Sequence, residues 1–304
     1  MDIRSSTGIP RLAWLAPAFL VACSSSGGGW VPIFDLGANP RGDMAARPGD
    51  DLAIAPGSDF ASGPIFDLAF PQDSAIACGA LGQPCCSGIT CTGLSTCQGG
   101  TCLAPQVWPI ADLRRGGVPQ NTAVSIAGAT VTAVKTAGNS HGFFVQDPNS
   151  ETYGGIYVFV GGAVPTCSPG AIVTATGVFS TYHGLDELDV RTGSYQVTGQ
   201  GALIQPVQTN IETLTTDNRF QSTLVYISGG FTASPVANGD QFTVAAGGYS
   251  ILITSFVAND VGPSPFPAAP GQLFSTITGL GFQVGPNGGP YAPALAPRSP
   301  ADLR

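Results

Sequence analysis

Apolar and polar residues alternate in short runs from about residue 108 to residue 304. A period of two is typical of β-strands that bury one face, and the glycines and prolines between the runs indicate turns. The predicted strands are 123–134, 142–146, 155–160, 171–179 and 185–190, followed by 223–232, 241–245, 249–256, 272–280 and 291–295. This part of the chain is therefore expected to be mainly β.

The ten predicted strands form two series that resemble each other at a spacing close to 101 residues. Ile126-Ala127-Gly128 corresponds to Ile227-Ser228-Gly229, and Pro169-Gly170 corresponds to Pro270-Gly271. Such self-similarity indicates a duplicated unit. Five strands, of which the first bends at a glycine, favour a small closed barrel. We therefore predict two barrels in tandem, over residues 106–200 and 204–304.

The first series also carries the strand and turn phrases of a known domain type. These phrases are Val124–Ala133, Gly142–Asp147, Gly155–Val158, Pro169–Gly177 and Tyr182–Gly184. In this order they resemble the OB-fold-like domains of exported bacterial proteins, which are sometimes appended to secreted nucleases or phosphoesterases. The resemblance implies an OB-like barrel. No nuclease or phosphoesterase domain accompanies the barrels, so it brings no catalytic residues with it.

Residues 23–77 have no strand or helix period. They begin with a Ser/Gly run, continue in Ala, Pro, Gly and Asp, and repeat the phrase Pro32-Ile33-Phe34-Asp35-Leu36 at Pro64-Ile65-Phe66-Asp67-Leu68. Low aromatic content and acidic charge disfavour a packed core, and such a composition extends a chain. We expect a disordered tether.

Six cysteines are crowded into residues 78–102, with the spacing C-x6-C-C-x4-C-x5-C-x4-C. So short a segment cannot fold by apolar burial alone, and an exported chain favours disulfides. Zinc is the alternative, but no histidine lies nearby. The spacing resembles small knottin-like or EGF-like modules, and the 15 possible pairings stay open. The predicted disulfide cysteines are Cys78, Cys85, Cys86, Cys91, Cys97 and Cys102.

The first 22 residues have the order of a secretory signal. Arg4 and Arg11 precede a short apolar run that ends in Leu20-Val21-Ala22-Cys23. The run is too short to cross a hydrocarbon core of about 30 Å. The motif resembles the lipobox of bacterial lipoproteins, which implies cleavage before Cys23 and lipidation of that cysteine. With Ser24 next, the resemblance implies an outer-membrane anchor and a periplasmic or surface location.

Charge and composition narrow the possible partners. The net charge is −8, charged residues make up 10% of the chain, and Lys135 is its one lysine. Proteins that grip nucleic acid need a basic surface, so nucleic acid is not an expected partner. The acidic balance fits solubility outside the cytoplasm. The expected partners are the membrane, through the N-terminal lipid, and a glycan or envelope protein.

Aromatic side chains are the best candidates for a ligand surface, because OB barrels bind oligomers on the face of their second and third strands. The resemblance places Phe144, Tyr153, Tyr157, Tyr182 and His183 near that face. Stacking on these rings would suit sugars or bases. Strand alternation sends Phe143 and Phe144 to opposite sides, so at least one of them is expected in the core.

Metal and nucleophile signals are weak. Side chains with oxygen ligands occur at every second position in Asp147, Asn149 and Glu151, as they do in calcium-binding loops. The segment lacks the glycine and the distal Glu of an EF-hand loop. Acidic residues follow His183 in sequence. Strand alternation places Glu187 and Asp189 on one face of the strand and Asp186 on the other, so they are not expected to form one site with His183. The simpler interpretation is that these side chains are solvated polar groups at a sheet edge. Cys167 has no visible base nearby, so a free thiol or an intermolecular bridge is expected.

We therefore expect a mainly β protein, with two OB-like small β-barrels in tandem after a disulfide-rich mini-module and a disordered tether. The expected function is non-catalytic, the display of a binding surface for a glycan or protein ligand, with no cofactor. An accessory or cryptic extracellular hydrolase or nuclease component, working through His183 and Asp186, is one alternative. A purely structural envelope spacer is the other.

Overall fold

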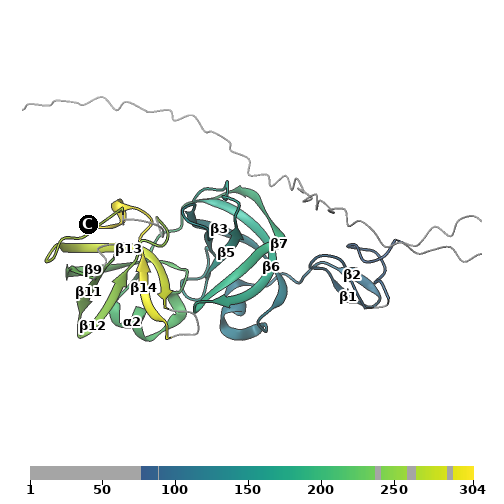
Figure 1. Ribbon diagram of the computed structural model, residues 1–304, viewed down its shortest axis with the longest axis horizontal. Helices are drawn as coiled ribbons and strands as arrows, with labels where there is room; N and C mark the ends of the chain where they lie inside the picture. The colour runs from purple at the N-terminus through teal and green to yellow at the C-terminus, as the bar shows by residue number, and fades with distance from the viewer. Residues whose placement is uncertain (1–76, 88, 237–240, 259–264, 286–289) are drawn as a thin grey trace, which may run out of the picture.

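The computed structural model describes residues 77–304 except 88, 237–240, 259–264 and 286–289. Figure 1 shows a small hairpin module, a first barrel and a second barrel, one after another along the long axis. The fold is mainly β, as predicted. The predicted signal peptide, the predicted lipidation site Cys23 and the predicted tether lie outside the described residues. Within the described residues, no helix has the length and apolarity needed to span a membrane.

The cysteine-rich segment is a disulfide module built on a two-stranded hairpin, β1 (Thr96–Gln98) and β2 (Thr101–Leu103). Its three disulfides are Cys78–Cys86, Cys85–Cys97 and Cys91–Cys102. The predicted disulfide staple is therefore present, and the zinc alternative is wrong because all six thiols are bonded to one another. The first cysteine pairs with the third, the second with the fifth and the fourth with the sixth.

Because the module has little apolar core, we expect it to depend on these bonds. Replacing Cys85 and Cys97 together by serine should lower the stability of the module by about 2–4 kcal/mol. Limited proteolysis should then cut within residues 78–102 and leave both barrels intact. If the barrels were degraded at the same rate as the module, the module would be part of one folding unit with them.

The first barrel is closed, with hydrogen-bonded strand order β3-β4-β5-β7-β6. Its strands are β3 (Thr122–Lys135), β4 (His141–Gln146), β5 (Gly155–Gly161), β6 (Ala171–Tyr182) and β7 (Leu185–Gln200). Alternate residues such as Ile126, Phe143 and Leu188 fill the interior. The predicted bend in β3 is a register shift at Gly128, whose φ of +73° suits glycine.

The second barrel repeats this strand order in a sheet ordered β10-β11-β12-β14-β13-β9-β8. Its strands are β8 (Val207–Thr209), β9 (Leu224–Thr232), β10 (Ser234–Pro235), β11 (Phe242–Ala246), β12 (Tyr249–Ile253), β13 (Leu273–Val284) and β14 (Ala292–Ala296). One residue, Ala233, separates β9 from β10. β9 and β10 together therefore correspond to β3 of the first barrel, which is one continuous strand. Because β10 and β9 lie toward opposite ends of the sheet order, the sheet curls round on itself.

The duplication extends further toward the N-terminus of each barrel than the strand pattern suggested. A short helical segment precedes the first barrel and consists of α1 (Ile110–Asp112) and η1 (Leu113–Gly117). The corresponding helix before the second barrel is α2 (Ile211–Thr216). Two further short helices are η2 (Asn218–Phe220), which follows α2, and η3 (Pro300–Asp302), near the C-terminus. Ile110 and Leu113 are buried in one core and Ile211 and Leu214 in the other, again 101 residues apart. The Asn210 side chain caps α2 by accepting from the Thr213 amide at 2.8 Å.

The outer face of the first barrel packs directly on the second barrel. A third apolar core joins them, formed by Ala133, Phe144, Tyr157 and Leu185 from the first barrel and Leu224, Val257, Leu280, Phe282, Ala294 and Ala296 from the second. A Cβ atom at Gly155 would clash with the Ser222 carbonyl, so glycine permits the close approach of the two backbones. The barrels form one packed unit.

Arg114 lies at the centre of the polar part of this contact. Its Nη1 donates to the Gln221 carbonyl at 2.8 Å and its Nη2 to the Asn218 carbonyl at 2.7 Å, while Nε lies 3.4 Å from the Asp186 carboxylate. Its side chain is fully buried. Burial lowers the pKa of the guanidinium, and Asp186 opposes that shift. Because a guanidinium stays protonated in proteins, Arg114 is a buried cationic link between the barrels.

Cys167 lies in the core of the first barrel and is the one described cysteine outside a disulfide. The residue is 7% exposed. A bridge to another chain would require that core to open. Cys167 packs as a small apolar residue.

Candidate functional site

The face of β4 and β5 that OB barrels commonly use for ligands is the face that contacts the second barrel. Phe144 on β4 and Tyr157 and Phe159 on β5 point outward, whereas Phe143 and Val158 point into the first barrel. The second barrel covers most of this outer face and leaves a cavity of about 750 Å³ beside the contact. We call this cavity the inter-barrel pocket.

The inter-barrel pocket takes its walls from both barrels and has a size suited to small ligands. From the first barrel it is lined by Asn139, Ser140, Tyr157, Phe159, Tyr182, His183, Leu185, Glu187 and Arg191, and from the second by Phe256, Phe282, Gln283, Val284 and Gly285. Neither barrel alone contains the site. The pocket therefore depends on the docking of the barrels.

Aromatic rings form one wall of the pocket and run back into the interface. The rings of Phe256 and Phe282 stack at 4.3 Å between centroids, and Tyr157 lies 6.1 Å from Phe256. Behind them, Phe144 contacts Tyr157 at 4.7 Å. The Tyr157 hydroxyl donates to the Ser140 carbonyl at 2.6 Å, which orients the ring. This wall offers flat apolar surface at fixed positions.

Glu187 is the carboxylate of the pocket. On β7 it is paired with Tyr157 of β5 on one side and Ser180 of β6 on the other. It is 8% exposed and accepts a hydrogen bond of 3.3 Å from Ser180 Oγ. Burial, with a further contribution from the Asp189 charge, raises the pKa of Glu187 to about 7. The site thus holds a carboxyl group that changes charge near neutral pH.

Asp189 and Arg191 form a separate ion pair next to Glu187. Arg191 Nη2 lies 2.6 Å from Asp189 Oδ2, and Arg191 Nε donates to both carboxylate oxygens. Burial tends to raise the pKa of Asp189, but the hydrogen bonds from Arg191 outweigh it and hold that pKa below its ordinary value. The guanidinium lies 5.0 Å from the centroid of Phe159. The two charges therefore largely satisfy each other.

Three of the five aromatic or histidine residues predicted from sequence meet in this pocket. Tyr157 forms part of its wall, Tyr182 lies 60% exposed at its edge, and the His183 ring lies 4.1 Å from that of Tyr182. His183 Nδ1 is 3.0 Å from the Gly285 carbonyl of the second barrel. These three predicted residues therefore lie together at the inter-barrel pocket.

Two of the five lie elsewhere. Phe144 is fully buried in the inter-barrel core, so its prediction as a ligand contact is wrong. Apolar residues of the second barrel cover the surface where a ligand was predicted to contact Phe144. Tyr153 lies beneath Arg114 and Arg115, at 5.5 and 5.0 Å, and its amide donates to the Arg219 carbonyl. Tyr153 therefore contributes to the contact between barrels rather than to the pocket.

The weak metal and hydrolase signals do not assemble into a site. Asp147 accepts from the Asn149 amide at 2.9 Å in a turn, and Glu151 is exposed. Among the described residues, the one close group of three His, Cys, Asp or Glu ligand atoms is Cys85, Cys91 and Cys102, all in disulfides. In this structure Asp147 and Asn149 therefore form a local turn.

The acidic run after His183 divides between two faces. Asp186 binds Arg114 and accepts from Thr181 Oγ1 at 2.8 Å, on the side away from Glu187 and Asp189. His183 and Asp186 therefore do not share a site. The interpretation of Glu187 as a solvated edge group is also wrong, because this residue is only 8% exposed.

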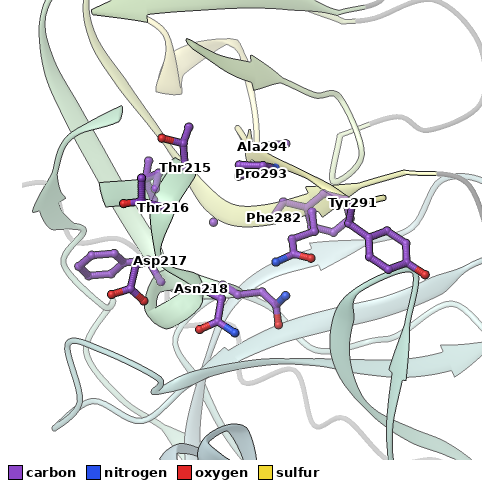
Figure 2. A pocket seen from close by; sticks show the side chains of 13 residues that line it. Thr215, Thr216, Asp217, Asn218, Phe282, Tyr291, Pro293 and Ala294 are labelled. Carbon is purple, nitrogen blue, oxygen red and sulfur yellow. The ribbon is translucent and has the colours of Figure 1, made fainter. Parts of the chain in front are cut away.

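A smaller cavity of about 210 Å³ lies within the second barrel (Figure 2). Thr215, Thr216, Asp217 and Asn218 border it on one side, with Tyr291, Pro293 and Ala294 on the other. The Asp217 carboxylate accepts from the Arg219 amide at 2.8 Å and pairs with the Arg219 side chain. The Asp217 carboxylate on the wall of this smaller cavity is therefore already engaged in a local turn. The inter-barrel pocket is the stronger candidate site.

The sequence pattern missed Phe159, Phe256 and Phe282, which complete the pocket. A signal was nevertheless present, since Tyr157 and Phe159 alternate onto the outer face of a predicted barrel strand. Two aromatic rings on an outer face imply a covering partner. No sequence pattern indicates that Phe256 and Phe282 of the second barrel are that cover.

The chain matches no protein-family model, and no curated protein matches it in sequence. Solved structures similar to it include a putative aspartyl-tRNA synthetase from Leishmania major Friedlin, with 16% identity over 39% of this chain and a TM-score of 0.27. The chain spans a quarter of that synthetase. The p204 HINb domain matches with 9% identity over 58% of this chain and 93% of the domain, at a TM-score of 0.28. A chain described as "Structural mimicry for functional antagonism" matches with 12% identity over 59% of this chain and 90% of that one, at 0.30. At such scores the OB-like assignment rests on the strand order of this chain itself.

Proposed function

We propose that this chain is a non-catalytic, lipid-anchored protein of the bacterial cell envelope that binds a glycan or a protein segment in the inter-barrel pocket. The observation that carries the proposal is the pocket itself, an aromatic-walled cavity of about 750 Å³ with a buried carboxyl group. Such pockets, with few polar groups on apolar walls, are the usual form of ligand sites. The lipobox-like Cys23 and the six bonded cysteines support an exported, outer-membrane-anchored location.

A binding screen of the mature chain tests the ligand proposal. The chain from residue 23, with Cys23→Ser to keep it soluble, would be screened against glycans, peptidoglycan fragments and peptides. We expect a saturable ligand whose affinity falls at least tenfold in Tyr182→Ala, because this exposed ring borders the pocket. Tyr249→Ala is the matched control, since Tyr249 is also exposed but lies outside the pocket lining. Absence of any ligand would favour a structural spacer.

Lipidation is tested separately in a Gram-negative host. The wild-type chain is expected to incorporate labelled fatty acid and to fractionate with the outer membrane, because several acyl chains give firm anchoring. Cys23→Ala should lose both properties, whereas Cys167→Ala should keep them because that thiol is buried in the first barrel. Labelled, membrane-bound Cys23→Ala protein would refute the lipobox assignment.

Glycoside hydrolysis is a second candidate, favoured by one observation. Glu187 and Asp189 lie on the same face of β7, and their pKa values are displaced in opposite directions, as in an acid and nucleophile pair. Against it, Asp189 does not line the pocket and both its oxygens accept from Arg191. Hydrolysis of aryl glycosides that both Glu187→Gln and Asp189→Asn abolish would establish this activity in place of simple binding.

A further inference from the structure

We propose that the inter-barrel pocket recognises its ligand through an organic ammonium group that pairs with Glu187 and lies against the aromatic wall. The inference rests on the proposed function and names the chemistry of its ligand. A protonated amino sugar and a quaternary ammonium headgroup both carry this chemistry.

Glu187 is a buried carboxylate with little compensation from the protein. Its hydrogen-bond donor among the described residues is Ser180 Oγ, at a long 3.3 Å. A carboxylate that is 8% exposed is costly unless a cation or several donors face it. A cavity lies on its open side. A ligand cation placed there would supply the missing partner.

The neighbouring charged and titratable groups are already engaged. Arg191 donates to Asp189 on the same strand, and Lys135 Nζ from β3 donates to the Ala137 carbonyl at 2.6 Å. The His183 ring contacts the Gly285 carbonyl, and the Tyr157 hydroxyl donates to Ser140. From the described part of the second barrel, the residues that line the pocket carry no formal charge. Glu187 is therefore the one carboxyl group among the described residues that line the pocket, and the neighbouring Arg191 is bonded to Asp189.

The rings of the pocket suit a cation. Phe159 already contacts the Arg191 guanidinium at 5.0 Å, and Phe256 contacts Lys135 Nζ at 4.9 Å. Both distances are within the range of cation–π attraction. Tyr182, Phe282 and Tyr157 present further aromatic surface to the same cavity. An anionic ligand would meet Glu187 with the same sign of charge, and a neutral one would leave the carboxylate unpaired.

Two matched pairs of probes test the inference on the mature chain with Cys23→Ser. Choline is compared with its neutral isostere 3,3-dimethylbutan-1-ol, and glucosamine with N-acetylglucosamine, by calorimetry. We expect each cation to bind at least tenfold more tightly than its neutral partner. Because choline has a permanent charge, its affinity should rise about tenfold from pH 6 to pH 8 as Glu187 ionises. The two pairs also distinguish a headgroup from an amino sugar.

Glu187→Gln should abolish both the preference for the cation and the pH dependence. Glu212→Gln, an exposed position on α2, is the matched control and should change neither. Neutral probes that bind as tightly as the cations, or cations that fail to bind at millimolar concentration, would overturn the ammonium proposal. In that case a ligand from the screen of glycans, peptidoglycan fragments and peptides would still support the pocket as the binding site, provided that Tyr182→Ala weakens its binding. The two proposals can therefore fail separately.

Discussion

Arg114→Ala is expected to lower the free energy of unfolding by about 3–5 kcal/mol and to uncouple the two barrels. The substitution removes a buried cation that donates to the carbonyls of Asn218 and Gln221. It also leaves the Asp186 carboxylate without its cationic partner, although Thr181 Oγ1 still donates to that carboxylate. Losing one partner of a buried charged network carries a penalty of this size. Urea unfolding followed by fluorescence and calorimetry should show one transition for the wild type and two for the variant.

Arg115→Ala is the matched control for this experiment. Arg115 is adjacent in sequence and exposed, and its recorded contact is with the Tyr153 ring. Its loss should change the stability by about 1 kcal/mol or less. If Arg114→Ala were as mild as Arg115→Ala, the polar contact would not hold the barrels together, and the apolar core around Phe144 would have to do so alone.

Glu187→Gln is expected to stabilise the protein at pH 8 by up to about 3 kcal/mol, while it weakens ligand binding. The folded-state pKa of Glu187 is about 7, above the ordinary glutamate value of 4.5. The folded state therefore holds a proton that the unfolded state releases at lower pH. The contribution of Glu187 to stability is fully present below pH 4.5 and is lost as the pH rises to about 7.

Unfolding free energies measured from pH 4 to pH 8 test this prediction. In the wild type, ionisation of Glu187 should lower the free energy of unfolding between about pH 4.5 and pH 7. Subtracting the values of Glu187→Gln from those of the wild type separates this effect from the titration of other groups. A constant difference across that range would mean that Glu187 has an ordinary pKa. A residue that destabilises its own fold at neutral pH is the pattern expected of a functional group.

The strands could be predicted because each barrel buries alternate residues. The predicted runs 142–146 and 155–160 agree with β4 (His141–Gln146) and β5 (Gly155–Gly161) to within one residue at each end. The second half of β7 was missed, since residues 191–200 are mostly exposed and only Tyr195 and Val197 pack inward. Helix α2 was missed because it spans six residues, fewer than two helical turns.

The site could be predicted only in part, because it exists between two barrels rather than within one. The local pattern brought Tyr157, Tyr182 and His183 together through their place on the first barrel. It could not predict that the second barrel would cover Phe144 or that Glu187 would be buried. Docking depends on the shapes of two folded surfaces, and residues as distant in sequence as His183 and Gly285, 102 positions apart, carry no local signal of their contact.

The most direct test of the inter-barrel site is amide chemical-shift mapping of the mature chain during titration with choline, glucosamine, N-acetylglucosamine and peptidoglycan fragments. We predict that a binding probe shifts amides around Tyr182–Glu187 of the first barrel together with those around Phe282–Gly285 of the second. Shifts that saturate together on both barrels would place the ligand between them. Shifts confined to the disulfide module or to one barrel would contradict the account.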